Sequence, residues 1–457
     1  MEKTGNSMSS SSTELKSGRG DDSLPQLQKH HSIFGYTLGC RLNVYETEAL
    51  LDEFRHKCGV KRVNNPDDAT IILVNTCAVT ARSTARSRKY VRSFCRRNKP
   101  ELVVVTGCVA EVAPEEFEKQ DAIVLPNTAK SDLVEIVAGK LGIPLLVKTV
   151  EKESLNPFFP LVAPEIINRT RAFLKIQDGC DNQCTYCIVP AARGRSRSQP
   201  RDLVLSQARK IASAGFSEIL LTGVDLVRYG MDLYGRDYGL VHLVRELLKI
   251  GGFRVRLSSM EPIGLSTSML ESIALPGVCR HLHIPVQSGS DRILEKMGRM
   301  YTSDDIKVLF DRSMELFPGI GIGADVIVGF PGETEDDFRK TVDIVSHPAV
   351  AYLHVFPFSA RPGTPAASMR EIMIHTETIT ERARYLRSLS RKKRIRFRTS
   401  QAGTDAQVLV ESRVHKDTGR LIGMTDNYIP VISPPGSREG DMLQMTLQMD
   451  DICWDIR

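Results

Sequence analysis

The sequence predicts an α/β protein with an N-terminal open parallel-sheet domain, a central six-unit (β/α) partial barrel and a C-terminal small all-β barrel. Three observations predict this architecture. The chain has 457 residues, more than one domain usually holds. Strand-like apolar runs alternate with helix-length segments from about residue 31 to about residue 370, a pattern typical of parallel sheets. Residues 401–457 instead combine short strand-like runs with turn residues.

Residues 1–30 are rich in Ser, Gly and charged side chains and lack the apolar core of a signal peptide. This composition predicts that residues 1–30 form a disordered tail. Ten cysteines without a secretory signal favour a reducing cytoplasm and metal chemistry over disulfides. No apolar run approaches the ~20 residues that span a membrane, so we expect a cytoplasmic protein without a membrane partner.

Residues 31–150 repeat one pattern three times: a strand-like run ends at a cysteine, and a helix-length stretch follows. The runs cover residues 34–40, 71–77 and 103–108. Right-handed crossovers place the carboxyl ends of parallel strands at one edge, where open α/β sheets bind ligands. We therefore expect Cys40, Cys77 and Cys108 to converge, although any one of them alone could be a small buried core residue.

Residues 165–398 predict six strands separated by helices, followed by a long basic helix at about 371–398. The expected strands are 172–176, 218–222, 253–258, 281–285, 320–328 and 351–357. The expected helices are 202–214, 240–250, 303–316 and 335–346. Six parallel units make an incomplete barrel, open on one side, whose chemistry lies at the carboxyl ends of the strands.

Three cysteines follow the first strand of this barrel with the spacing CxxxCxxC: Cys180, Cys184 and Cys187. Three thiolates on one short loop can hold three corners of a 4Fe-4S cluster and leave one iron open, which makes them the catalytic candidates. A structural zinc site would need four protein ligands. Zinc and accidental free thiols are the alternatives.

The CxxxCxxC loop and the text after it, Ile188-Val189-Pro190 and Arg-Gly-Arg-Ser-Arg-Ser at 193–198, resemble the radical S-adenosylmethionine methylthiotransferase family. The resemblance extends from about His31 to the C-terminus. It implies that the loop holds the 4Fe-4S cluster that binds S-adenosylmethionine. It also implies that the three strand-end cysteines hold a second, auxiliary 4Fe-4S cluster.

Four residues near strand ends are candidates for contact with S-adenosylmethionine: Gly223, Glu261, Gln287 and Asp325. Their surroundings resemble the LTG, EP, PVQSGSDR and DVIVGFPGE motifs of the family. A glycine allows close approach of a ligand to the backbone. For each of the others, a turn or a strand-end hydrogen bond is the alternative. His281 and His283 alternate along a strand, which is more typical of packing residues, and we assign them no role.

Residues 39–48, Gly-Cys-Arg-Leu-Asn-Val-Tyr-Glu-Thr-Glu, look most like the tRNA N6-threonylcarbamoyladenosine methylthiotransferases. The implied reaction replaces the C–H bond at carbon 2 of that adenine, beside the anticodon of tRNA, with a methylthio group. Because this hydrogen is not acidic, the chemistry must be carried by cofactors. The radical reaction would also need an electron donor, which the sequence does not identify. Isopentenyladenosine in tRNA and a ribosomal protein aspartate are alternative substrates. A non-catalytic iron-sulfur RNA-binding protein is an alternative of another class.

Charge is distributed unevenly along the chain. Residues 82–99, 193–201 and 382–398 hold eight, four and nine basic residues and no acidic one, whereas the whole chain has a net charge of only +6. Such runs indicate nucleic-acid binding, with solvated helix faces as the alternative. Residues 400–457 resemble the RNA-binding TRAM barrel but contain five basic and nine acidic residues. We therefore expect the basic helix to make much of the phosphate contact.

Overall fold

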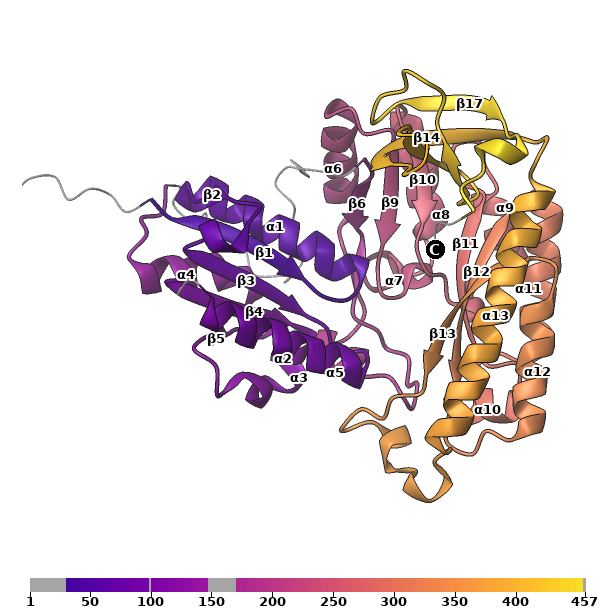
Figure 1. Ribbon diagram of the computed structural model, residues 1–457, viewed down its shortest axis with the longest axis horizontal. Helices are drawn as coiled ribbons and strands as arrows, with labels where there is room; N and C mark the ends of the chain where they lie inside the picture. The colour runs from indigo at the N-terminus through magenta and orange to yellow at the C-terminus, as the bar shows by residue number, and fades with distance from the viewer. Residues whose placement is uncertain (1–29, 98–99, 147–169, 455–457) are drawn as a thin grey trace, which may run out of the picture.

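The N-terminal domain is a parallel sheet with helices on both faces (Figure 1). The computed structural model describes residues 30–97, 100–146 and 170–454, so the expected N-terminal tail lies outside the described residues except for its last residue. The strand order is β2-β1-β3-β4-β5 and every pair is parallel. The strands are β1 Ser32–Thr37, β2 Lys61–Arg62, β3 Ile71–Thr76, β4 Leu102–Gly107 and β5 Ile123–Val124.

Two layers of helices cover this sheet because β3 and β4 are apolar on both faces. One face packs against α1 and α4, and the other packs against α2 and α3. The helices are α1 Arg41–Cys58, α2 Ala81–Arg96, α3 Cys108–Val112 and α4 Leu133–Leu141. The three predicted strands of this domain are confirmed, and two short edge strands were not predicted.

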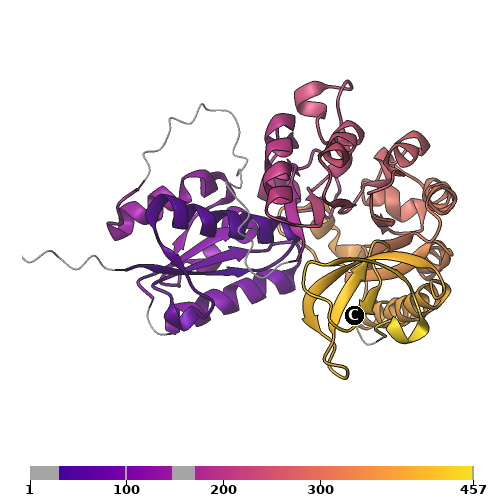
Figure 2. The same ribbon diagram turned by 90° about the horizontal axis from the view of Figure 1, so that it is seen from above.

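The central domain is the predicted six-stranded partial barrel (Figure 2). Two three-stranded parallel sheets, β6-β9-β10 and β11-β12-β13, are joined by parallel bridges from Val255 to Val278 and from Ser259 to His283. The strands are β6 Ala172–Lys175, β9 Glu218–Thr222, β10 Arg254–Leu257, β11 His281–Gln287, β12 Gly321–Val328 and β13 Val350–Pro357. The short antiparallel pair β7 Gln177–Asp178 and β8 Arg197–Ser198 lies beside them.

Helices surround the barrel and bury its apolar strands in one continuous core. The helices are α5 Val189–Arg193, α6 Arg201–Ser213, α7 Met231–Tyr234, α8 Leu240–Ile250, α9 Thr267–Ile273, α10 Asp291–Lys296, α11 Ser303–Leu316, α12 Glu335–Ser346 and α13 Thr376–Ser400. The predicted helices 240–250, 303–316 and 335–346 have the observed bounds. No helix in the described part of the chain is long and apolar enough to cross a membrane.

The long basic helix α13 packs on β13 and uses three of its cations internally. Arg382 pairs with Glu333 at 2.7 Å. Lys393 donates to the carbonyls of Ser346 and His347 at 2.9 and 2.8 Å, which satisfies the end of α12. Arg398 donates to the carbonyl of Cys453 at 2.6 Å, and all three side chains are buried. The basic helix was expected to make much of the phosphate contact, and these three buried cations are not available for it.

The C-terminal domain is an antiparallel sheet of order β16-β15-β14-β17 that caps one end of the barrel strands (Figure 1). Its strands are β14 Asp405–Val414, β15 Leu421–Thr425, β16 Pro430–Ile432 and β17 Met442–Thr446. Arg254 and Arg256 of β10 donate to main-chain carbonyls of this sheet at 2.6–3.0 Å. Glu411 and Asp426 pair with Arg171 and Arg280 of the barrel. Part of the sheet's acidity thus serves docking.

Glu218 pairs with Arg254 and Arg256, the two arginines that bind the C-terminal sheet. Its carboxylate is fully buried and accepts from Arg254 and Arg256 at 2.7 Å each. Burial alone would raise the pKa of Glu218, but Arg256 and Arg254 hold it well below the usual range. The carboxylate therefore remains charged and orients both guanidinium groups towards the C-terminal sheet.

We expect Glu218→Gln to lower stability by about 3–5 kcal/mol, because two buried cations lose their countercharge. The measurement is the midpoint of urea unfolding followed by circular dichroism. Glu315→Gln is the control, since Glu315 pairs with Arg312 at the surface and an exposed pair contributes little. A Glu218→Gln midpoint equal to that of the control would contradict this role.

Candidate functional site

A cavity of about 940 Å³ lies where the three domains meet. Its wall includes Cys40 and Cys77 of the N-terminal domain, Gly223 and Asp325 of the barrel, and Tyr428 of the C-terminal sheet. The open side of the partial barrel faces the N-terminal domain (Figure 2). The carboxyl ends of both parallel sheets therefore contribute to one site, as open α/β sheets and βα barrels lead one to expect.

The CxxxCxxC loop connects β7 to α5 and holds its three sulfurs near one another. The pKa of Cys180 is raised to about 11 and that of Cys187 to about 12, mainly by burial, and the neighbouring cysteines of the loop are part of the cause of each shift. Arg299 Nη1 lies 3.1 Å from the Sγ of Cys184. Three partly buried cysteines near one another, with a cation beside them, fit the ligand set of an iron-sulfur cluster.

Cys40, Cys77 and Cys108 follow three neighbouring strands, β1, β3 and β4, at the carboxyl edge of the sheet. Burial raises the pKa of Cys77 to about 11 and also raises that of Cys108, and neighbouring thiols of the triad add to each shift. Gly39, with φ 101°, lets the chain turn here, because a Cβ at this position would lie 2.8 Å from the Sγ of Cys77. This triad also fits three thiolate ligands of a cluster.

Gly223 and Gln287 lie at strand ends near the cavity. A Cβ on Gly223 would lie 2.9 Å from Oε1 of Gln177, which accepts from the next two backbone amides. Gln287 ends β11 with φ 62°. Tyr428 is the other non-glycine with positive φ among the described residues, and it too lines a wall of the site. Backbone strain of this kind clusters at functional sites.

Glu261 and Asp325 are already paired within the protein. Glu261 forms an ion pair with Arg299. Burial raises the pKa of Glu261, although Arg299 opposes the shift. Asp325 accepts from His283 at 2.7 Å and from His354 at 3.2 Å. Burial alone would raise the pKa of Asp325, but these two imidazoles lower it to about 2.

Aromatic side chains form the wall beside Asp325. The rings of His281 and Tyr428 have centroids 4.5 Å apart, and those of Tyr352 and His354 are 5.4 Å apart. His283, to which the sequence assigned no role, lines the cavity with Tyr352, His354 and Tyr428. Flat rings around a cavity can stack on a nucleic-acid base.

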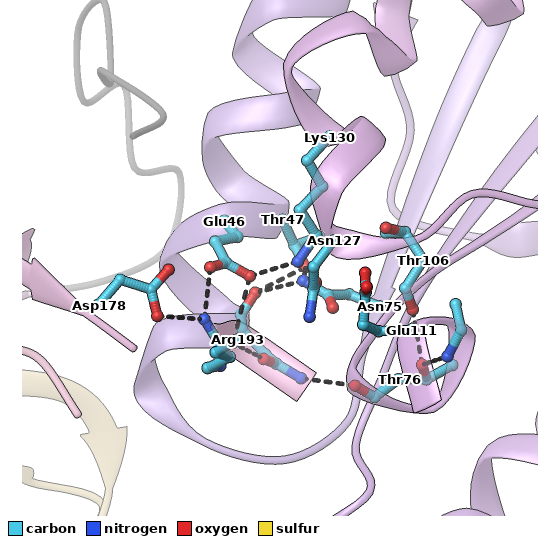
Figure 3. A network of polar contacts seen from close by, with 12 residues as sticks. Glu46, Thr47, Asn75, Thr76, Thr106, Glu111, Asn127, Lys130, Asp178 and Arg193 are labelled. Carbon is cyan, nitrogen blue, oxygen red and sulfur yellow. Dashed lines mark hydrogen bonds and ion pairs between the residues drawn. The ribbon is translucent and has the colours of Figure 1, made fainter. Parts of the chain in front are cut away.

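A network of buried charges joins the N-terminal domain to the cysteine loop of the barrel (Figure 3). Arg193 of α5 donates to Glu46 of α1 at 2.8 Å and to Asp178 at 3.0 Å. Lys175 binds the same two carboxylates at 2.8 and 2.7 Å. Lys130 binds Glu46 at 2.5 Å. Burial alone would raise the pKa of Glu46, but these three cations hold it well below its usual range.

Sequence reasoning missed Arg299 and the ion network. Arg299 comes after α10, more than a hundred residues from Cys184, and no local pattern indicates their contact. Arg193 was counted among surface cations that could bind nucleic acid. It is buried and ion-paired, so that expectation is wrong for Arg193. The one available signal was the adjacency of Arg193 to the cysteine loop.

Comparisons with known proteins agree with this arrangement. Residues 174–345 match the Radical SAM superfamily, and residues 32–125 match the family described as Uncharacterized protein family UPF0004. A radical S-adenosylmethionine methyltransferase, TsrM, from Kitasatospora setae shares the fold with a TM-score of 0.51 and 16% identity, over 74% of each chain. The fold and the cysteine loop thus define a radical S-adenosylmethionine enzyme.

Relatives that are named for their activity show which kind of radical S-adenosylmethionine enzyme this chain is. The Threonylcarbamoyladenosine tRNA methylthiotransferase MtaB of Bacillus subtilis (strain 168) is 34% identical over 87% of this chain and 89% of its own. MtaB of Aquifex aeolicus (strain VF5) is 36% identical over 86% and 95%. A tRNA-2-methylthio-N(6)-dimethylallyladenosine synthase of Zymomonas mobilis is 32% identical over 92% and 94%. The chain belongs to the tRNA methylthiotransferases, enzymes that modify tRNA with S-adenosylmethionine and 4Fe-4S clusters.

If both triads hold clusters, protein reconstituted without oxygen should bind about eight irons, in two cubes of four. Cys184→Ala and Cys77→Ala should each bind about four, measured by iron analysis and Mössbauer spectroscopy. Cys95→Ala is the control and should retain about eight, because Cys95 lies outside both triads. About four irons in the parent protein would show that only one triad holds a cluster.

Proposed function

We propose that this enzyme places a methylthio group on carbon 2 of N6-threonylcarbamoyladenosine beside the anticodon of tRNA. Residues 39–48 and the MtaB relatives support this substrate. The observation that carries it is the position of Arg41, which directly follows Cys40 and lines the cavity. The threonylcarbamoyl group ends in a carboxylate, whereas an isopentenyl group is an uncharged hydrocarbon.

Arg41 is available to bind an anion. Its side chain is half-buried, and none of the described carboxylates forms an ion pair with it. Its charge acts on neighbouring side chains. Burial raises the pKa of Tyr352, and Arg41 opposes this rise. Burial lowers the pKa of His281, and Arg41 lowers it further. Asp325, the one carboxylate on this wall in the described part of the chain, is already engaged by hydrogen bonds from His283 and His354. Arg41 therefore offers a cation on the cavity wall to which the carboxylate of a modified base could bind.

The side chains of the site have separable tasks in this proposal. Clusters and S-adenosylmethionine, when bound, would supply the radical and sulfur chemistry that a non-acidic C–H bond requires. The CxxxCxxC triad would hold the cluster that binds S-adenosylmethionine, and the strand-end triad would hold the auxiliary cluster. Tyr352 and Tyr428 would stack on the adenine. Arg299 donates a hydrogen bond to the Cys184 sulfur and pairs with Glu261.

Isopentenyladenosine is the second candidate substrate, because relatives such as the Zymomonas mobilis enzyme are named for that product class. Mass spectrometry of tRNA nucleosides tests both candidates. Cells that lack the enzyme should accumulate N6-threonylcarbamoyladenosine, and expression of this chain should convert it to the 2-methylthio form. Conversion of isopentenyladenosine instead would reject the proposed substrate.

The two triads should separate by function. Cys184→Ala should abolish both reductive cleavage of S-adenosylmethionine to 5′-deoxyadenosine and methylthiolation, because it removes a ligand of the cofactor-binding cluster. Cys77→Ala should still form 5′-deoxyadenosine when reduced but should leave the tRNA unmodified. Both products are measured by liquid chromatography and mass spectrometry on one preparation of known iron content. A well-folded Cys77→Ala protein that methylthiolates near the parent rate would refute the auxiliary site.

Arg41→Gln should remove the preference of the enzyme for RNA that carries the threonylcarbamoyl carboxylate. The parent protein should bind an anticodon stem-loop that contains N6-threonylcarbamoyladenosine roughly tenfold or more tightly than the same RNA with plain adenosine, since hydrogen bonds between charged groups contribute about 1.5–3 kcal/mol. Arg41→Gln should lose most of this preference, and Arg41→Lys should keep part of it. Fluorescence anisotropy measures both affinities. An unchanged preference in Arg41→Gln would assign the recognition elsewhere.

A further inference from the structure

Two helices from different domains present rows of exposed cations beside the cavity. On α2, Arg82, Arg86 and Lys89 are exposed and recur with helical spacing. Residues four and three positions apart lie on one helix face. Arg82 also lines the cavity. The fourth cation nearby, Arg88, is instead paired with Glu116, so it does not belong to this row.

On α13 the exposed row consists of Arg384, Arg387 and Arg391. None of the three forms an ion pair with a carboxylate in the described residues, in contrast to Arg382 on the buried side of the same helix. The row extends over roughly 10 Å of helix axis. Arg387 lines the same cavity as Arg82.

The loop after β13 connects the two rows. The backbone amide of Ala81, at the start of α2, donates to Oγ of Ser359 at 3.0 Å. Arg361 donates to Oγ1 of Thr84 at 2.9 Å. Because β13 packs directly against α13, the two helices lie on either side of this loop (Figure 1). The rows therefore flank one opening, and their members meet at the cavity.

We propose that these two rows bind phosphates of the tRNA backbone on opposite sides of the cavity, so that one RNA contacts the N-terminal domain and the barrel together. The inference rests on the tRNA substrate of the proposed function. Unpaired arginines and lysines spaced along a helix suit a phosphate chain. The aromatic wall between the rows suits an unstacked base of a single-stranded loop. The acidic C-terminal sheet uses carboxylates for docking and offers less charge to RNA.

The test measures how affinity for an unmodified anticodon stem-loop RNA depends on salt. One variant carries Arg384→Ala and Arg391→Ala, and another carries Arg86→Ala and Lys89→Ala. Each pair should flatten the slope of log affinity against log salt by roughly one to two units, about one for each phosphate that the variant no longer neutralises. The four-residue variant should show the sum of both reductions. Lys307→Ala with Arg312→Ala on α11 is the matched control and should leave the slope unchanged.

Iron content and the thermal midpoint are measured for every variant, so that a folding defect is recognised. If the double variant of either row leaves the slope unchanged, RNA does not bind on both sides of the cavity and the proposal is overturned. If the control pair flattens the slope equally, the effect is a general attraction between charges and the proposal is likewise overturned. The RNA in this experiment lacks the threonylcarbamoyl group. If the slopes fall as expected while the nucleoside assay finds no methylthio product, the proposed function fails and the surface stands.

Discussion

The relative position of the two cysteine triads depends on charges buried between the N-terminal domain and the barrel. Arg193 lies between Glu46 of α1 and Asp178, two residues before Cys180. Its Nη2 also donates to Asn43 Oδ1 at 2.6 Å, three residues after Cys40. Removing one partner from such a set leaves a buried charge uncompensated, which is far more costly than losing a surface pair. One guanidinium thus fixes both cysteine loops.

The same network has more cations than carboxylates. Lys130, Lys175 and Arg193 surround Glu46 and Asp178, and Arg197 adds a further ion pair with Asp178. Burial alone would lower the pKa of Arg193, but Glu46 and Asp178 raise it well above its usual range, and Cys108 and Cys40 add to this rise. Excess positive charge beside these cysteines suits thiolates, which are anionic when they bind iron. The interface therefore matches the charge of the ligands that it positions.

Local pattern was enough to predict the six barrel strands and the helices α6, α8, α11 and α12, but not the shorter elements α5, α7, α9, α10, β7 and β8. Buried parallel strands such as β9 and amphipathic helices such as α8 carry their periodicity within a dozen residues. Pattern also placed Cys40, Cys77 and Cys108 after strands, although their roles as ligands stay a prediction. The tertiary contacts of individual side chains could not be predicted from local pattern. Arg193 and Lys393 look like surface cations in the sequence, and only the carboxylates and carbonyls that face them in the fold show otherwise.

The docking of the C-terminal sheet has an evolutionary consequence. Arg254 and Arg256 hold it mainly through main-chain carbonyls, which every amino acid provides. Apart from Glu411 and Asp426, whose carboxylates pair with the barrel, substitutions in that sheet can therefore accumulate without loss of docking, as long as its backbone path is kept. Tyr428 reaches the cavity from this tolerant module. Related chains could thus exchange a wall of this cavity by recombining one terminal segment, while both cysteine triads remain untouched.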